Sequence, residues 1–208
     1  MKWSGLAIPS TFPPDRRPIY LHPTALMNRK NREQSYPLIA EAIGKILCKE
    51  STKGLVHTVS YDLCKFLAQY NYSTSRPIFS YSTSGEKDRI IKKYLGSNNG
   101  VIFAPSLERG IDLPQTTCRF VVVVKLPFPN LGTKQVSARL YRPGGQLWYN
   151  VKTVRSLVQM TGRGMRSETD YCNSYILDKQ FITLLWKRNK HLLPQWWREA
   201  LVWNAGQL

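Results

Sequence analysis

The stretch Phe120-Val121-Val122-Val123-Val124 places five apolar residues in a row near the middle of the 208-residue chain. Continuous apolar runs of this kind are typical of strands buried on both faces of a parallel sheet, whereas half-exposed strands alternate polar and apolar residues. We therefore predict a buried strand here, at the centre of a sheet covered by helices on both faces.

Segments of strand and helix character alternate on both sides of this run. Strand-like composition is found at 54–59, 77–81, 100–104 and 171–177. Helical periodicity is found at 31–49, 62–69, 86–95 and 149–165, and one or two further helices are expected within 181–202. This alternation predicts an α/β domain with a mainly parallel central sheet.

The first thirty residues have a different character from the rest of the chain. Prolines exclude a continuous helix in this segment, and they stand at Pro9, Pro13, Pro14, Pro18 and Pro23. We therefore predict an extended, Pro-rich entry arm over residues 1–30, followed by a folded domain over residues 31–208.

The chain is strongly basic, with 30 Lys and Arg against 13 Asp and Glu and a formal net charge of +17. Such an excess suits a polyanionic partner, because each phosphate that is neutralised releases a counterion. The alternative is a basic protein whose charge serves only solubility. The cations are scattered and not gathered on one amphipathic helix, which argues against a membrane surface as the partner. The sequence has neither a signal-peptide core nor a membrane-spanning apolar stretch, so we expect an intracellular protein that is not secreted.

Cysteine and histidine spacing predicts no metal site. The cysteines are far apart and form no CxxC pair, so local spacing builds neither a zinc knuckle nor an iron–sulfur cluster. Isolated thiols of this kind fit a reducing compartment. The histidines are isolated as well, and they stand at His22, His57 and His191.

The most specific stretch is Gln159-Met160-Thr161-Gly162-Arg163-Gly164-Met165-Arg166. On a helix, a spacing of three would put Arg163 and Arg166 on nearly the same side, and two guanidinium groups aimed at one point suit a phosphate chain. A basic helix end on the surface is the alternative. The overlapping GxGxxG-like pattern at 162–167 closes a predicted helix instead of opening one, so we exclude a dinucleotide fingerprint.

This stretch resembles helicase motif VI, whose form is QxxGRxxR. Residues 106–114, Ser-Leu-Glu-Arg-Gly-Ile-Asp-Leu-Pro, resemble motif V, and residues 57–61, His-Thr-Val-Ser-Tyr, resemble motif IV. The three stretches occur in the order expected of the second RecA-like lobe of superfamily 2 helicases. Residues 125–130, 136–141 and 170–181 are similar to the XPD/DinG branch, although Arg109 stands where that branch usually has an acid.

The resemblance implies a RecA-like three-layer domain that forms half of an ATP-driven motor on single-stranded nucleic acid, with DNA favoured over RNA. It implies Arg166 as an arginine finger toward ATP, Arg163 as its companion, and Gln159 as a residue that orients the phosphate end of the site. The implied nucleotide contacts include Gly162, Gly110 and Asp112; a helix N-cap is an equal alternative for Asp112.

The implied nucleic-acid contacts are made by Ser60, Tyr61, Ser106 and Arg109. For Tyr61, simple packing is an equal alternative. Base stacking by the tryptophans near the C-terminus is weighed against core packing, and their helical spacing favours the core.

Two motifs that an ATPase needs are missing from the sequence. It contains no GxxxxGK[ST] phosphate loop and no apolar strand that ends in an Asp-Glu pair for magnesium. The resemblance therefore implies that ATP and Mg²⁺ are held by a first RecA-like lobe, in cis or in trans, and that this chain alone is inactive. The alternative function is a non-catalytic, basic nucleic-acid-binding remnant of a helicase, against which the intact pair Arg163 and Arg166 argues.

Overall fold

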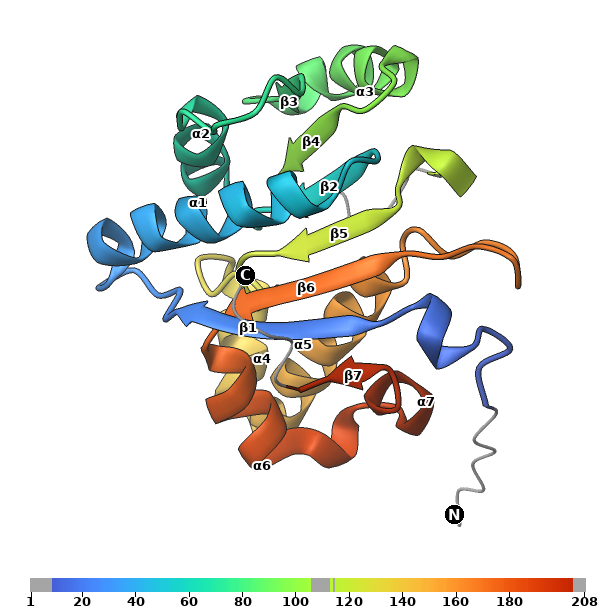
Figure 1. Cartoon of the computed structure of the whole chain (residues 1–208). Coiled ribbons are helices and arrows are strands. Elements are labelled where there is room, and N and C mark those ends of the chain that lie inside the picture. Colours follow the sequence, from blue (N-terminus) through green and yellow to red (C-terminus); the bar gives the residue numbers. More distant parts are fainter. Residues whose placement is uncertain (1–8, 106–112, 114, 204–208) are drawn as a thin grey trace.

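The computed structural model describes residues 9–105, 113 and 115–203, and its centre is a seven-stranded sheet (Figure 1). The strand order is β3-β4-β2-β5-β6-β1-β7, and every pair of neighbours is parallel. The strands are β1 (Ile19–Ala25), β2 (Gly54–His57), β3 (Ile78–Ser80), β4 (Val101–Ala104), β5 (Phe120–Val123), β6 (Asn173–Asp178) and β7 (Leu201–Val202).

The predicted central strand is confirmed as β5. It pairs with β2 on one side and with β6 on the other, and all of its residues are buried. Its neighbour β2 and the next strand β4 are also buried throughout. Continuous apolar runs therefore mark the strands that have neighbours on both edges and helices on both faces.

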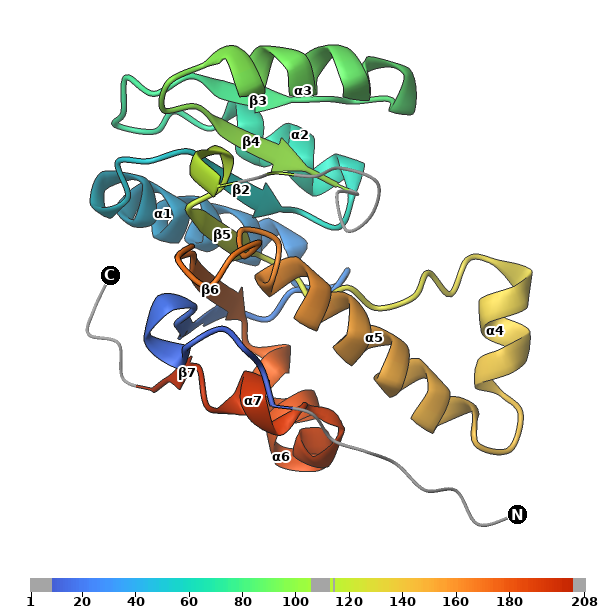
Figure 2. The same ribbon diagram turned by 90° about the vertical axis from the view of Figure 1, so that its right-hand side faces the viewer.

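Helices cover both faces of the sheet, which confirms the three-layer α/β fold (Figure 2). On one face lie α1 (Arg32–Lys49) and α2 (Tyr61–Gln69), which pack on one buried apolar cluster. On the other face lie α3 (Lys87–Gly96), α5 (Gly145–Thr161) and α7 (Gln195–Arg198), which pack on a second cluster. Two short helices, α4 (Lys134–Leu140) and α6 (Lys187–Asn189), complete the set of α-helices in the described ranges.

The predicted entry arm contains a strand, and the prediction of a purely extended arm is wrong for that part. Residues 19–25 form β1, which pairs with both β6 and β7 inside the sheet. The prolines did exclude a helix, but extended backbone is also the conformation of a strand. Pro23 lies where the β1–β6 register shifts, between Leu21 and Ala25, as expected for a residue without an N–H donor.

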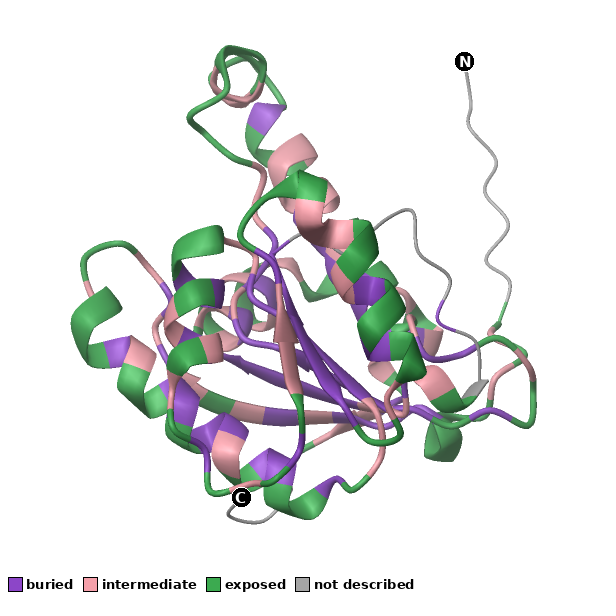
Figure 3. Ribbon diagram, turned by 90° about the horizontal axis from the view of Figure 1, so that it is seen from above, coloured by how far each residue is buried: buried purple, intermediate pink, exposed green. Residues whose placement is uncertain are grey.

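The C-terminal region contains the predicted helices in a broken form. Residues 181–202 form a π-helical segment (Phe181–Trp186), two short α-helices, a 3₁₀ turn (Lys190–Leu192) and the edge strand β7, which was not predicted. Buried residues concentrate in the sheet and on the helix sides that face it (Figure 3). Within the described ranges, no helix combines the length and apolar character that crossing a membrane requires.

Candidate functional site

The stretch that resembles motif VI lies at the end of α5. This helix buries Val154, Leu157 and Met160 against the sheet and ends at Thr161, followed by Gly162 as its C-cap. The predicted helix over 149–165 is therefore shifted toward the N-terminus, and a glycine just past the last turn is a common helix stop. Arg163 and Arg166 lie beyond the end of the helix, so helical spacing does not place this pair on one side.

Gly164 fixes the path of the chain between the two arginines. A Cβ atom at this position would lie 2.4 Å from the carbonyl oxygen of Cys118 and 2.5 Å from Sγ of Cys172. Cys118 lies two residues before β5 and Cys172 directly precedes β6, so the turn lies against the amino ends of these two strands. The close approach requires glycine.

Asp170 holds the turn that carries Arg166. Its Oδ2 accepts hydrogen bonds from the backbone N–H groups of Arg166 and Ser167, both at 2.9 Å, and its Oδ1 lies 3.2 Å from Nη1 of Arg119. Asp170 is only 2% exposed, and burial alone would raise its pKa. The two N–H donors and the guanidinium of Arg119 outweigh that effect and lower the pKa below its usual value. The carboxylate is therefore charged, and it positions Arg166.

Arg163 is half-buried and lies near His57, the last residue of β2. His57 is completely buried, and neither of its ring nitrogens has a hydrogen-bond partner among the described residues. Burial, and secondarily the positive charge of Arg163, lower the pKa of His57 to about 3. The imidazole is therefore neutral beside Arg163.

The remaining predicted nucleotide contacts are only partly placed. Gln159 and Gly162 are exposed at the end of α5. Gly110 and Asp112 lie outside the described residues, as do Ser106 and Arg109 from the predicted nucleic-acid set.

Ser60 and Tyr61 follow β2, whereas residues 162–167, which we call the motif VI turn after the motif they resemble, adjoin the opposite, amino edge of the sheet. The Ser60 hydroxyl caps α2 by accepting the N–H of Leu63 at 3.4 Å, and Tyr61 is 43% exposed with its ring edge-on to Tyr81. Val59, just before them, has φ of 63°, which is strained for a β-branched residue. The structure thus assigns Ser60 a capping role and leaves the Tyr61 ring accessible.

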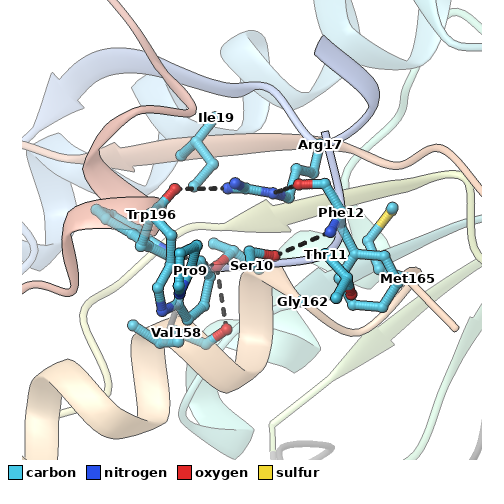
Figure 4. Close-up of a pocket in the computed structure, with 12 residues that line it drawn as sticks. Pro9, Ser10, Thr11, Phe12, Arg17, Ile19, Val158, Gly162, Met165 and Trp196 are labelled. Atoms are coloured by element: carbon cyan, nitrogen blue, oxygen red, sulfur yellow. Dashed lines mark hydrogen bonds between the residues drawn. The ribbon is translucent and has the colours of Figure 1, made fainter. Parts of the chain in front are cut away.

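The N-terminal arm packs beside the motif VI turn and borders an open pocket of about 350 Å³ (Figure 4). Arg17 anchors the arm: its Nε donates to the carbonyl of Phe12 and its Nη1 to the carbonyl of Trp196, both at 2.8 Å. On the same side, the buried Trp197 donates its indole N–H to Oγ1 of Thr161 at 2.8 Å. Core packing, which the sequence favoured over base stacking, is thus confirmed for Trp197, whereas it is wrong for Trp203, which is 43% exposed.

The parts of the chain that the structure describes contain no group of three or more His, Cys, Asp or Glu residues arranged to hold a metal ion. The site therefore offers guanidinium groups on a turn, which are suited to anionic phosphate. It offers no carboxylate cluster for Mg²⁺ within those residues.

Sequence comparison identifies the family. The sequence model of the helicase C-terminal domain matches residues 43–200. The chain is 28% identical over 108 residues to the ATP-dependent DNA helicase XPD of Sulfolobus acidocaldarius, covering 46% of this chain and 20% of that protein. It is 26% identical over 147 residues to the ATP-dependent DNA helicase CHL1 of Vanderwaltozyma polyspora, covering 61% of this chain and 17% of that protein.

Structure comparison agrees with the sequence match. The fold is similar to that of S. tokodaii Xpd4, with a TM-score of 0.63 and 15% identity, covering 89% of this chain and 37% of that one. At this identity the likeness shows the RecA-like fold alone. The chain spans a fifth or less of the two helicases that it matches in sequence. With the family match extending over most of its length, the chain belongs to the helicase C-terminal domain family.

Proposed function

We propose that this chain is the second motor lobe of an ATP-dependent translocase or helicase that acts on single-stranded nucleic acid, with DNA favoured. Arg166 acts as the arginine finger toward the γ-phosphate, Arg163 is its companion, and Gln159 and Gly162 line the phosphate end of the site. Gly110 and Asp112 complete the nucleotide contacts, while Ser60, Tyr61, Ser106 and Arg109 contact the strand. ATP and Mg²⁺ are held mainly by a first RecA-like lobe, in cis or in trans.

The observation that carries this proposal is the fixed turn around Arg166. A charged, buried Asp170 binds two consecutive N–H groups of the turn, and Gly164 seats it against the central strands. A guanidinium on a preorganised backbone stabilises charge that develops in a transition state without reorganisation at the moment of reaction. Arginine fingers in related NTPases contribute roughly 10³–10⁵ in rate.

The test is complementation by a first lobe, supplied in the same polypeptide or as a separate one. We expect no ATP turnover by the 208-residue chain alone, and turnover stimulated by single-stranded DNA when the first lobe is present. Magnesium-dependent turnover by the isolated chain that survives Arg166→Ala would contradict the proposal, provided the preparation is free of contaminating ATPase.

The same experiment distinguishes the motor lobe from the alternative, a non-catalytic nucleic-acid-binding remnant. A remnant would bind single strands with or without the first lobe, but the combination would hydrolyse no ATP. If Arg166→Ala abolished strand binding and left turnover intact, the motif VI arginines would be a nucleic-acid patch and not part of the ATP site.

A further inference from the structure

Although Lys and Arg are scattered along the chain, one continuous segment carries much of the net positive charge because it has no acidic residues. Residues 113–167 contain nine Lys or Arg and no Asp or Glu, so over half of the net charge of +17 is carried by about a quarter of the chain. The nine are Arg119, Lys125, Lys134, Arg139, Arg142, Lys152, Arg155, Arg163 and Arg166. Most of this segment is the connection from β5 through α4 to α5.

The connection forms a hairpin of two helices that extends from the carboxyl end of the sheet (Figure 2). We call residues 130–148 the α4–α5 hairpin. Its base is anchored by Tyr149, whose ring stacks on Phe128 with centroids 5.8 Å apart and whose hydroxyl donates to the carbonyl of Pro129 at 3.0 Å. Beyond this anchor, α4 has no buried residue. Burial in the core of this domain therefore does not account for the presence of α4.

The two helices enclose an open pocket of about 560 Å³. Its lining includes Arg139, Arg142 and Trp148, and the guanidinium of Arg139 lies 4.6 Å from the centre of the Trp148 ring. Both arginines are exposed, and neither forms an ion pair within the described ranges. Next to them, Tyr141 is 82% exposed, which is unusual for a large aromatic side chain.

The α4–α5 hairpin and the proposed nucleic-acid contacts Ser60 and Tyr61 both follow strands that end at the same edge of the sheet. β2 and β5 are neighbours that end in register, with His57 opposite Val123, and the N–H of Val124 donates to the carbonyl of His57 at 3.2 Å. The segment that leads to Ser60 and Tyr61 and the segment that leads to the hairpin therefore start side by side.

We propose that the α4–α5 hairpin is a second binding surface for a single strand of nucleic acid, in which Arg139 and Arg142 contact backbone phosphates and Tyr141 stacks on a base. The proposal rests on the nucleic-acid function proposed above and adds a site to it. Exposed cations interleaved with an accessible ring are the elements of a sequence-tolerant grip on single strands. Forked guanidinium groups suit phosphate oxygens, and a purely apolar partner would leave these charges desolvated.

The first experiment compares two double variants of the full chain. The double variant Arg139→Ala with Arg142→Ala removes two charges from the hairpin. The double variant Lys92→Ala with Lys93→Ala removes two exposed charges from α3, which packs on β3 and β4 at the edge of the sheet. The probe is a fluorescein-labelled oligothymidylate in a salt titration. We expect the hairpin variant to lose roughly tenfold in affinity. Its log–log salt slope should flatten by about 1.4, while the α3 variant changes little.

The second experiment locates the bound oligonucleotide directly and tests whether the Tyr141 ring stacks on a base. Oligonucleotides carrying 5-iodouracil are photocrosslinked to the wild-type chain, and the crosslinked peptides are identified by mass spectrometry; we expect a crosslink at Tyr141. Tyr141→Ala should weaken binding by roughly fivefold or more, and Tyr141→Phe should leave it nearly unchanged, because stacking needs the ring and not the hydroxyl. Thermal unfolding of each variant checks that these exposed substitutions leave the fold intact.

The outcomes separate this proposal from the one on which it rests. If the wild-type chain binds no oligothymidylate at low salt, the nucleic-acid function fails and the hairpin site fails with it. If the chain binds but crosslinks form only outside residues 130–148, or both double variants lose equal affinity, the hairpin proposal alone is overturned. Polyglutamate that competes as well as oligothymidylate of equal charge would also overturn it, because the surface would then select only for negative charge.

Discussion

Oδ2 of Asp170 accepts the backbone N–H of Arg166 at 2.9 Å, so a buried carboxylate sets the path of the residue proposed to reach ATP. Asp170→Asn replaces a charged acceptor that serves two N–H donors and Arg119. We expect the free energy of unfolding to fall by roughly 1.5–3 kcal/mol, the range for hydrogen bonds to charged groups. Urea denaturation measures the change, and the exposed Asp15→Asn, as the matched control, should be nearly neutral. An Asp170→Asn variant as stable as wild type would show that the carboxylate does not hold the turn.

Gly164→Ala should be among the most destabilising small substitutions in the chain. The added methyl group would overlap the Cys118 carbonyl and the Cys172 thiol, both less than 3 Å away. We expect a loss of about 1–3 kcal/mol, typical of overpacking. Gly96→Ala, where the new Cβ meets nothing within 4 Å, is the control and should change stability little. Equal thermal unfolding midpoints for the two variants would contradict this account of the motif VI turn.

The neutral His57 makes stability depend on pH. Its pKa is about 3 in the folded protein and 6.5 ordinarily, so between these values the unfolded chain binds more protons. The free energy of unfolding should therefore decrease as pH falls from 6.5 toward 3, with a contribution from this residue approaching about 1.4 kcal/mol per pH unit.

Urea denaturation at a series of pH values checks this expectation. His57→Phe should show a shallower acid dependence than wild type, because phenylalanine cannot be protonated. The exposed His191→Asn should retain the wild-type dependence. If His57→Phe retains it as well, the imidazole is not the group responsible.

Arg166→Ala should reduce ATP turnover of the complemented motor by about 10²-fold or more, while ATP binding is barely weakened. A finger acts on the transition state more than on the ground state. Arg166→Lys should rescue poorly, because an ammonium group lacks the planar fork. Arg163→Ala should also be damaging, and the double variant should lose less than the product of the two single losses, as for groups that act on one phosphate.

The sequence predicted the centre of the fold better than its periphery. β5 and β2 are identifiable because burial on both faces demands an apolar run, and that demand is local. β1 was not predicted as part of the sheet because its prolines suit an arm equally well, and only pairing with β6 and β7 decides between the two. The two-residue β7 is too short to leave a periodic signal.

The sequence predicted which residues form the candidate site, but it did not predict the local structure that holds them. The resemblance to motif VI identified Arg163 and Arg166, yet the helix predicted over 149–165 ends at Thr161. The true helix end depends on contacts of Gly164 with residues before β5 and β6, which no local pattern contains. The role of Asp170 depends in the same way on Arg119, which is 51 residues away in the sequence.

The continuity of α5 has a mechanical consequence. Between Gln146 and Thr161 the helix contains no glycine or proline, so it lacks the usual points at which helices bend. Its 17 residues span about 25 Å, from the α4–α5 hairpin to the Gly162 that precedes Arg163. Because Val154, Leu157 and Met160 fix this helix to the sheet, it holds the hairpin and the arginine-bearing turn at a constant separation.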